Sequence, residues 1–257
     1  MLNETPLSRV IHAQAEKYGE RVALRYRDYD QNQWKDISWN EFSRRVRLVS
    51  NALLHLGVEV QENIATFSQN KPECMFVDFG SYGIRAVTIP FYATSSETQV
   101  KYMVSDANVR YIFVGEQYQY DIALRVMQIG PHVKKLIIFD PKVKRNPQDK
   151  TSMYFDEFLR LGEEHPNQAE VDKRSAELQP DDLANILYTS GTTGLSKGVM
   201  QTHRQYATAF RGHVTALNLS DKDVILNFLP FTHLFERAWS YLSICNGCTL
   251  CVHLPPR

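Results

Sequence analysis

Along the first 140 residues, segments in which apolar residues recur at helical spacing alternate with short apolar segments typical of strands. Helical spacing is clearest after Ser38, where apolar side chains recur every three or four residues until Gly57. Short apolar runs, which are typical of buried strands, separate the helical segments. The predicted strands are 22–26, 33–37, 63–67, 84–90, 111–114 and 135–139. One helix is predicted after Pro6, and further helices are predicted at 38–56, 71–81, 94–105 and 117–127. This β-α-β-α order predicts a parallel sheet with helices on both faces.

Local signals mark the ends of several elements. Ser38 with Glu41 and Thr94 with Glu97 match the capping box, in which a hydroxyl and a carboxylate three residues later satisfy backbone N–H groups. Each pair predicts the start of a helix. The polar segment 28–32 separates the first two strands and predicts a hairpin.

The second half of the chain continues the pattern after an interruption. Residues 141–180 are polar, contain four prolines and predict an irregular connection with one short helix near 154–161. The predicted strands that follow are 183–187, 198–201, 224–229 and 249–252, and the helices are 203–217 and 234–244, the latter with Phe235, Trp239 and Leu242 facing inward. We expect an α/β fold of doubly wound, mostly parallel sheets with flanking helices, in two halves, 1–140 and 181–257.

Composition narrows the function classes. The chain has 257 residues, 43% hydrophobic and 23% charged, which suffices for a buried core. Its 29 basic and 29 acidic residues balance, so no basic excess indicates nucleic acid as a partner. No apolar run approaches the roughly 20 residues that span a bilayer, and residues 1–16 lack the apolar core of a signal peptide. We expect a cytoplasmic protein, with membrane contact at most peripheral and on the inner face.

Three of the four cysteines form a C-x-x-C-x-x-C pattern at Cys245, Cys248 and Cys251. An iron–sulfur motif of the ferredoxin type continues with a fourth cysteine, but Pro255 stands at that position. The remaining cysteine, Cys74, has no informative spacing. We therefore interpret these side chains as small hydrophobic groups rather than as ligands of a cluster or of zinc.

The strongest chemical signal is the segment 188–198, which reads Tyr-Thr-Ser-Gly-Thr-Thr-Gly-Leu-Ser-Lys-Gly between two predicted strands. Small side chains let backbone N–H groups approach an anion, and hydroxyls with one ammonium group complete a cradle for phosphate oxygens. The P-loop, G-x-x-x-x-G-K-S/T, is a different design. Here Ser196 replaces its second glycine, Gly198 replaces its hydroxyl residue, and Lys197 leads into a strand rather than a helix. A P-loop NTPase is therefore disfavoured.

Three segments resemble motifs of the adenylate-forming enzymes, a superfamily of acyl-CoA synthetases, luciferases and adenylation domains. Residues 189–198 are similar to its signature S/T-S/G-G-S/T-T-G-x-P-K-G, with Ser196 where the family usually has proline. Serine leaves the loop less stiff. Residues 89–96 resemble V-P-x-Y-x-T-S-S, and residues 228–237 resemble L-P-x-x-H-x-F-E-R, whose ending is most similar to long-chain fatty acyl-CoA synthetases.

This resemblance implies a two-step reaction that uses ATP, Mg²⁺ and coenzyme A. A carboxylate attacks the α-phosphorus and pyrophosphate leaves; a thiol then displaces AMP. Donors around the leaving pyrophosphate stabilise its charge. The implied nucleotide-binding residues are Thr189, Ser190, Gly191, Thr192, Thr193, Gly194 and Lys197. Lys197 supplies the positive charge, and the Thr192 hydroxyl is implied to lie near the magnesium ion.

His233 is the second candidate catalytic residue. The resemblance places it beside the acyl and adenylate pocket, where it would orient the carboxylate or shape the pocket wall. A histidine between Phe231 and Phe235 also suits a hydrogen-bonded core position. Glu236 and Arg237 are interpreted as solvated or locally paired charges without a catalytic role.

Family members are roughly twice as long, with a large and a small mobile domain. Their acidic magnesium ligand, ribose-binding aspartate, hinge and second catalytic lysine lie downstream of residue 257. We expect an incomplete amino-terminal domain without the carboxy-terminal mobile domain, inactive on its own. Uncovered strand edges would favour self-association into a homo-oligomer.

Three functions stay open at this point. The first is a fatty acid–CoA ligase, with a long-chain fatty acid and ATP as substrates. The second is a synthetase for another carboxylate, such as an aryl or medium-chain acid. The third is a nucleotide- or acyl-binding protein without catalysis.

Overall fold

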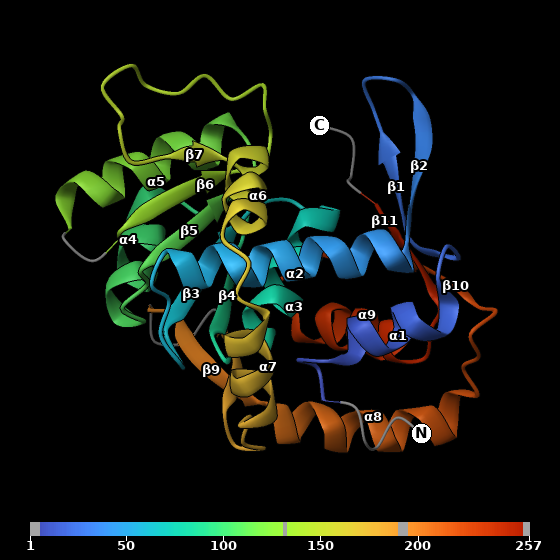
Figure 1. The fold of residues 1–257 in the computed structure, drawn as a ribbon. Helices are drawn as coiled ribbons and strands as arrows, with labels where there is room; N and C mark the ends of the chain where they lie inside the picture. The colour runs from blue at the N-terminus through green and yellow to red at the C-terminus, as the bar shows by residue number, and fades with distance from the viewer. Residues whose placement is uncertain (1–5, 131–132, 190–194, 254–257) are drawn as a thin grey trace.

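The computed structural model describes residues 6–130, 133–189 and 195–253. Within these residues the chain forms two β-sheets with packed helices (Figure 1). The strands of the larger sheet are, in spatial order, β7 (Met153–Tyr154), β6 (Lys135–Ile138), β5 (Tyr111–Val114), β3 (Asn63–Phe67), β4 (Val87–Phe91), β8 (Leu183–Thr189) and β9 (Lys197–Thr202). Neighbouring strands are parallel except β8 and β9, which are antiparallel. The predicted class of mostly parallel sheet with flanking helices is confirmed.

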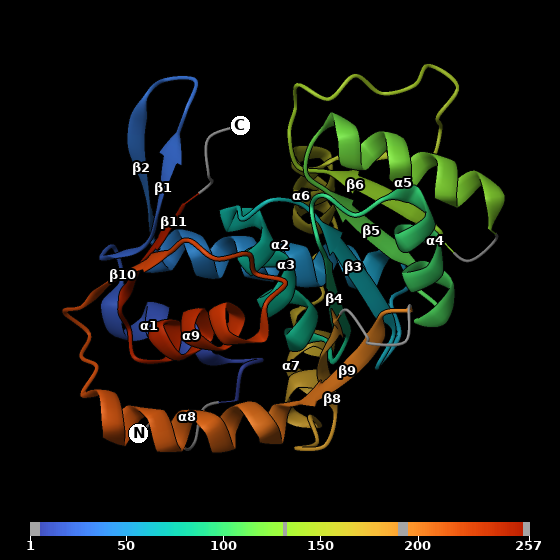
Figure 2. The same cartoon turned by 180° about the vertical axis from the view of Figure 1, so that it is seen from behind.

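Helices cover both faces of the larger sheet. One face packs against α2 (Trp39–His55), α3 (Pro72–Gly83) and α6 (Phe155–Glu164), and the other against α4 (Glu97–Asp106) and α5 (Gln117–Ile129). Successive strand residues point to opposite faces. Accordingly Tyr111 and Phe113 join the first core, whereas Ile112 and Val114 join the second. Figure 1 shows α2 and α6 in front of the sheet, and Figure 2 shows α4 and α5 from behind.

The smaller sheet joins the two ends of the sequence. Its strands are, in spatial order, β10 (Val224–Asn227), β11 (Thr249–Val252), β1 (Val22–Asp28) and β2 (Gln33–Ser38). The predicted β1–β2 hairpin is confirmed, and β1 also pairs in parallel with β11. The remaining helices are α1 (Val10–Tyr18), α7 (Gln168–Ala176), α8 (His203–Leu217) and α9 (Leu234–Cys245). Strands of the last 80 residues therefore enter both sheets.

Two predicted local features differ in the structure. Ser38 does cap α2 by accepting a hydrogen bond from the Glu41 N–H at 3.2 Å. The predicted cap at Thr94 is wrong, because the box consists of Ser96 and Gln99, two residues later. A turn closed by the Ser95 N–H and the Tyr92 carbonyl at 2.8 Å takes up the residues between β4 and the helix.

The segment 141–180 contains more structure than its pattern predicts. β7 adds a strand beside β6, and α6 occupies the place of the predicted short helix. The additional helix α7 was missed, because only Val171 and Ser175 of its residues are buried and the apolar period is therefore weak. Asn167 caps this helix through the Glu170 N–H.

Gly162 permits the close approach of α6 to α2, and its substitution should be costly. A Cβ atom at this residue would lie 2.0 Å from the Leu48 carbonyl oxygen and 3.2 Å from the Ala52 nitrogen. We expect Gly162→Ala to lower the free energy of unfolding by about 3 kcal/mol in urea denaturation. Gly212→Ala is the control, since a Cβ there meets nothing within 4 Å in the described structure, and it should gain up to about 1 kcal/mol. Equal effects of the two variants would contradict the packing at Gly162.

Candidate active site

The candidate site lies where β3, β4 and β8 end at the carboxyl edge of the larger sheet. Open α/β sheets bind ligands at this edge. Thr189 ends β8 and Lys197 begins β9, and the two residues are partners across the antiparallel pair. Both are exposed. The predicted strands on both sides of this segment are therefore confirmed, while the predicted contacts of Ser190, Gly191, Thr192, Thr193 and Gly194 lie outside the described residues.

Helix α4 supports the base of this loop. The Tyr102 hydroxyl donates a hydrogen bond to the Ser196 carbonyl at 3.1 Å, and the Tyr188 hydroxyl donates to Asp106 at 2.6 Å. The two tyrosine rings meet edge to face, with 6.3 Å between centroids. Burial and the Asp106 carboxylate raise the pKa of Tyr188 far above its usual range, so it stays a donor. Because Tyr102 binds a backbone carbonyl, serine at position 196 does not remove this anchor.

The other two motif segments meet beside a small cavity. The exposed ring of His233 packs edge to face on Tyr92, with 5.5 Å between centroids. The cavity has a volume of about 100 Å³ and is lined by residues that include Thr66, Asn70, Pro90, Tyr92, Phe231 and Arg237. In the described residues no hydrogen bond, ion pair or ring contact joins His233 to Thr189 or Lys197. The structure thus pairs Thr189 with Lys197, and His233 with the 89–96 segment.

The start of α9 corrects two predictions. Phe235, predicted to face inward, is 70% exposed, whereas Arg237, predicted to be a solvated or locally paired charge, is 1% exposed. Glu236 is buried as well and accepts a hydrogen bond from the Asn227 amide. Desolvation raises the pKa of Glu236. Trp239 packs against the core and Leu242 is buried, as predicted. Glu236 and Arg237 are buried because they have polar partners on other elements.

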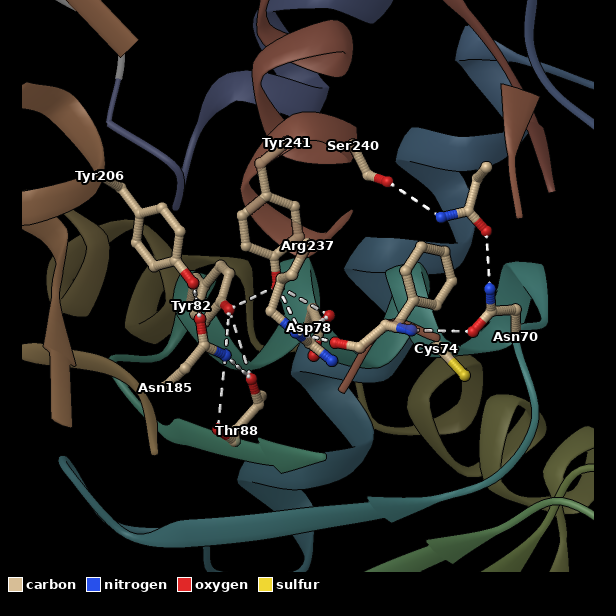
Figure 3. Close-up of polar contacts among 12 residues, drawn as sticks. Asn70, Cys74, Asp78, Tyr82, Thr88, Asn185, Tyr206, Arg237, Ser240 and Tyr241 are labelled. Carbon is tan, nitrogen blue, oxygen red and sulfur yellow. Dashed lines mark hydrogen bonds and ion pairs between the residues drawn. The ribbon is translucent and has the colours of Figure 1, made fainter. Parts of the chain in front are cut away.

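The partner of Arg237 is Asp78, a buried acid in the middle of α3 (Figure 3). The Arg237 Nη1 donates to Asp78 Oδ2, and its Nε donates to the Phe231 carbonyl at 2.8 Å. The Tyr241 hydroxyl donates to the same Asp78 oxygen at 2.8 Å. A buried charge is tolerated only with such a set of partners.

The hydrogen bonds continue from α9 to the strand that leads into the loop. The hydroxyls of Tyr241 and Tyr82 are 2.7 Å apart, and the Asn185 amide donates to Tyr82 at 2.8 Å. The Tyr206 hydroxyl of α8 donates to the Asn185 oxygen, also at 2.8 Å. Figure 3 shows this chain of polar groups between α9, α3, β8 and α8. We call the set Asp78, Tyr82, Asn185, Tyr206, Arg237 and Tyr241 the buried polar network.

Sequence reasoning missed this network. Asp78 stands alone among apolar residues of α3, and Asn185 stands alone in an apolar strand. A polar residue inside a buried element needs a partner, so these two positions carried a signal. The partners come from segments far apart in the sequence, and no local pattern identifies them.

An apolar groove runs between α8 and α9. It has a volume of about 340 Å³, within the usual range for ligand pockets. Its lining includes Tyr206, Phe210, Phe235, Ala238, Trp239 and Leu242. Exposed Phe235 therefore contributes to a concave apolar surface.

The cysteines behave as small hydrophobic groups. Burial raises the pKa of Cys74 and Cys245 to about 12, so both thiols stay protonated. The Cys248 thiol donates to the Ser220 carbonyl at 3.2 Å. In the part of the chain that the structure describes, no three His, Cys, Asp or Glu side chains gather to hold a metal ion, and no helix there is long and apolar enough to cross a membrane.

An open, mostly parallel sheet with a loop at its carboxyl edge is the arrangement of the α/β proteins that bind ligands at this edge. A model of a known family, described as AMP-binding enzyme, matches residues 11–257. The chain therefore belongs to the AMP-binding enzyme family, and the resemblance seen in the three sequence segments is confirmed.

Curated relatives and solved structures agree with this assignment. The chain is 27% identical to the human long-chain-fatty-acid–CoA ligase ACSBG1 over 96% of its own length and 34% of that protein. It is 30% identical to fatty acyl-CoA synthetase A of Dictyostelium discoideum, over 82% of this chain and 31% of that protein. The chain thus spans about a third of these relatives.

Among solved structures, the long-chain-fatty-acid-CoA ligase FadD1 of Archaeoglobus fulgidus matches with a TM-score of 0.80 at 19% identity. That match covers 99% of this chain and 48% of the other. The anthranilate CoA ligase AuaEII, in complex with anthranoyl-AMP, matches with a TM-score of 0.82 at 18% identity, over 98% and 45%. At these identities the likeness shows the shared fold.

Removing the charge of Asp78 should destabilise the fold strongly. Asp78→Asn keeps the shape but leaves Arg237 charged and buried without its counter-ion, so we expect a loss of roughly 3–5 kcal/mol in the free energy of unfolding. Asp36→Asn is the matched control, because Asp36 accepts a bidentate bond from Arg25 on the exposed hairpin; it should cost less than about 1 kcal/mol. Similar losses in urea denaturation would contradict the role given to burial.

Acid should destabilise the protein through His203, which starts α8. Its ring meets Tyr82 edge to face, and neither ring nitrogen has a hydrogen-bond partner among the described residues. Burial lowers the pKa of His203 from 6.5 to about 4, against a smaller opposing effect of Asp182. The unfolded chain therefore binds more protons between these values, and stability falls as the pH falls through this interval.

We expect His203→Phe to remove roughly 2–3 kcal/mol of the stability difference between pH 7 and pH 4.5, measured by urea denaturation. His213→Phe, at an exposed position of α8, is the control and should leave the difference unchanged. The account of His203 is wrong if both variants keep the wild-type pH dependence.

Proposed function

We propose that the protein containing this chain activates a fatty acid with ATP to an acyl-adenylate and transfers the acyl group to coenzyme A. The observation that carries this proposal is the pairing of Thr189 with Lys197 at the base of the hydroxyl-rich loop. This pairing sets one ammonium group and one hydroxyl on the two sides of the loop, at the edge where α/β folds bind nucleotides. Membership of the AMP-binding family supports the same chemistry.

In the first step a carboxylate oxygen attacks the α-phosphorus of ATP, and the bond to the pyrophosphate oxygen breaks. The Lys197 ammonium, with the hydroxyls of Thr189, Ser190, Thr192 and Thr193, would bind the β- and γ-phosphates and stabilise the charge that develops on pyrophosphate. The backbone N–H groups of Gly191 and Gly194 would complete the cradle. In the second step the thiolate of coenzyme A attacks the acyl carbonyl, and AMP leaves.

Magnesium prefers oxygen ligands and commonly binds phosphates together with few protein groups. The Thr192 hydroxyl is a donor of this kind and would be its protein contact. When bound, the ion neutralises phosphate charge. Lys197 and the loop hydroxyls would act on the same phosphates.

His233 would orient the carboxylate or form the wall beside it. Its exposed ring contacts Tyr92, and Tyr92 lines the cavity between the 89–96 and 228–237 segments. The Tyr92 contact holds the ring from one side, and its nitrogens would bind the substrate.

The groove between α8 and α9 supports a fatty acid as the substrate. Its lining is apolar and aromatic, and burial of methylene groups stabilises binding by about 0.8 kcal/mol for each group. By name, ACSBG1 is a long-chain-fatty-acid–CoA ligase, and the Dictyostelium relative is a fatty acyl-CoA synthetase. A medium-chain or aryl acid is the alternative substrate. We propose a cytoplasmic enzyme whose contact with membranes is at most peripheral.

The test is ATP–pyrophosphate exchange by the longest natural protein that contains this chain. We expect exchange that depends on palmitate and is weaker with octanoate or anthranilate. Lys197→Met should lower the rate by about 100-fold or more, because a charged donor to the leaving group is lost. Lys150→Met, on the exposed connection, should keep it.

Each other outcome has a distinct meaning for the proposal. Exchange with anthranilate or octanoate alone would move the substrate to the aryl or medium-chain class. ATP binding without exchange for any acid would indicate a nucleotide-binding protein without catalysis. An active Lys197→Met variant would contradict the role of the loop.

A further inference from the structure

We propose that Arg237 is a positioning residue, which fixes the turn 228–233 and thereby sets the place of His233 against Tyr92. The inference rests on the proposed function for its catalytic consequence. The backbone of Phe231 is held from both sides: its N–H donates to the Asn70 side chain at 2.9 Å, and its carbonyl accepts from Arg237 Nε at 2.8 Å. Asn70 also donates to the Leu229 carbonyl at 2.7 Å.

Arg237 is linked to His233 by backbone as well as by side chain. The His233 N–H donates to the Pro230 carbonyl at 2.9 Å, which closes the turn. The Arg237 N–H donates to the His233 carbonyl at 3.0 Å, the first hydrogen bond of α9. Both the backbone N–H and the guanidinium group of Arg237 therefore hydrogen-bond to the turn. A shift of that guanidinium group moves the Phe231 carbonyl and, two residues later, His233.

The guanidinium group has a fixed place because Asp78 and Tyr241 hold its far end. Arg237 Nη1 donates to Asp78 and, at 2.8 Å, to the Tyr241 hydroxyl. The side chains of Arg237 and Asp78 are each 1% exposed. A planar fork can donate to a carboxylate and a carbonyl at once, which a single ammonium point charge cannot reproduce in the same geometry. The requirement is therefore for arginine and not only for a positive charge.

The network also relates this turn to the phosphate loop. Tyr241 contacts Tyr82, and Tyr82 accepts from Asn185 on β8. Four residues after Asn185 the strand ends at Thr189, opposite Lys197. The turn that carries His233 and the strand that enters the loop are thus both attached to the buried polar network, whose side chains Figure 3 shows. Such a network would hold the carboxylate and the α-phosphorus in register, and misplacement by about 1 Å can cost on the order of 100-fold in rate.

The first arm of the test needs no catalysis. Hydrogen–deuterium exchange is followed by mass spectrometry in the longest natural protein that contains this chain. Arg237→Lys should speed exchange at residues 229–234 by at least about 10-fold while β3 and β5 keep wild-type protection. Arg25→Lys, in an exposed bidentate pair with Asp36, is the matched control and should change nothing in 229–234. Unchanged protection of this segment in Arg237→Lys would overturn the proposal.

The second arm is a double-mutant cycle on the ATP–pyrophosphate exchange rate. Arg237→Lys should lower kcat between about 10- and 100-fold with the KM for ATP retained, because the loop that binds ATP is intact. In a His233→Ala background the same change should have little further effect, since Arg237 acts through His233. Equal losses in both backgrounds, or no loss in either, would overturn the positioning role.

Two provisions keep the test decisive. If Arg237→Lys does not fold, Asn70→Ala removes the other hold on Phe231 and is measured in the same two arms with the same expectations. If the wild-type protein catalyses no pyrophosphate exchange with any of the acids tested, the proposed function has failed. The hydrogen-exchange arm still decides whether Arg237 fixes the turn.

Discussion

The ion pair between Arg237 and Asp78 is the contact on which the arrangement of the site depends. Removing two charges from water costs several kcal/mol for each ion, and their attraction repays this only when further hydrogen bonds satisfy them. Arg237 meets this condition through Phe231 and Tyr241, whereas Asp78 meets it at Oδ2 alone, through Tyr241. Asp78 Oδ1 has no partner among the described residues. The pair therefore contributes more to the placement of α9 on α3 than to net stability.

The position of α9 on α3 links both sheets to the candidate site. Helix α9 leads into β11 of the smaller sheet, and its start carries His233. Through Tyr82 and Asn185 the same network reaches β8, the strand that ends just before the hydroxyl-rich segment. Without the network, only loops would connect the start of α9 to the end of β8, and loops alone fix their relative position poorly. Buried hydrogen bonds with one satisfactory geometry remove that freedom.

Much of the fold could be predicted because it follows from local periodicity. The strand at 249–252 and the helix at 203–217 coincide with β11 and α8. The burial of Arg237 and the exposure of Phe235 at the start of α9 could not be predicted in the same way, since the sequence there offers both an apolar face with Phe235 and a polar face with Arg237. Which face is buried depends on Asp78, which is distant in the sequence. Pairing of β1 with β11 is equally non-local.

In the candidate site, too, local features could be predicted from the sequence and contacts between distant segments could not. The strand after Lys197 was predicted from residue spacing, and β9 confirms it. The roles of Lys197 and of the hydroxyl-rich loop stay predictions. The contact of His233 with Tyr92 joins two motifs whose spacing in the sequence says nothing about their distance. The network beneath them was missed, because its members look like isolated polar residues in apolar elements.

The central claim is that this fold serves the formation of an acyl-adenylate, and the fate of one oxygen atom tests it most directly. Palmitate labelled with ¹⁸O in its carboxylate is incubated with ATP, Mg²⁺, coenzyme A and the longest natural protein that contains this chain. Attack on the α-phosphorus followed by transfer to the thiol leaves one carboxylate oxygen on the phosphate of AMP, so the account predicts AMP that carries one ¹⁸O atom. Unlabelled AMP, or ADP with labelled inorganic phosphate, would contradict it.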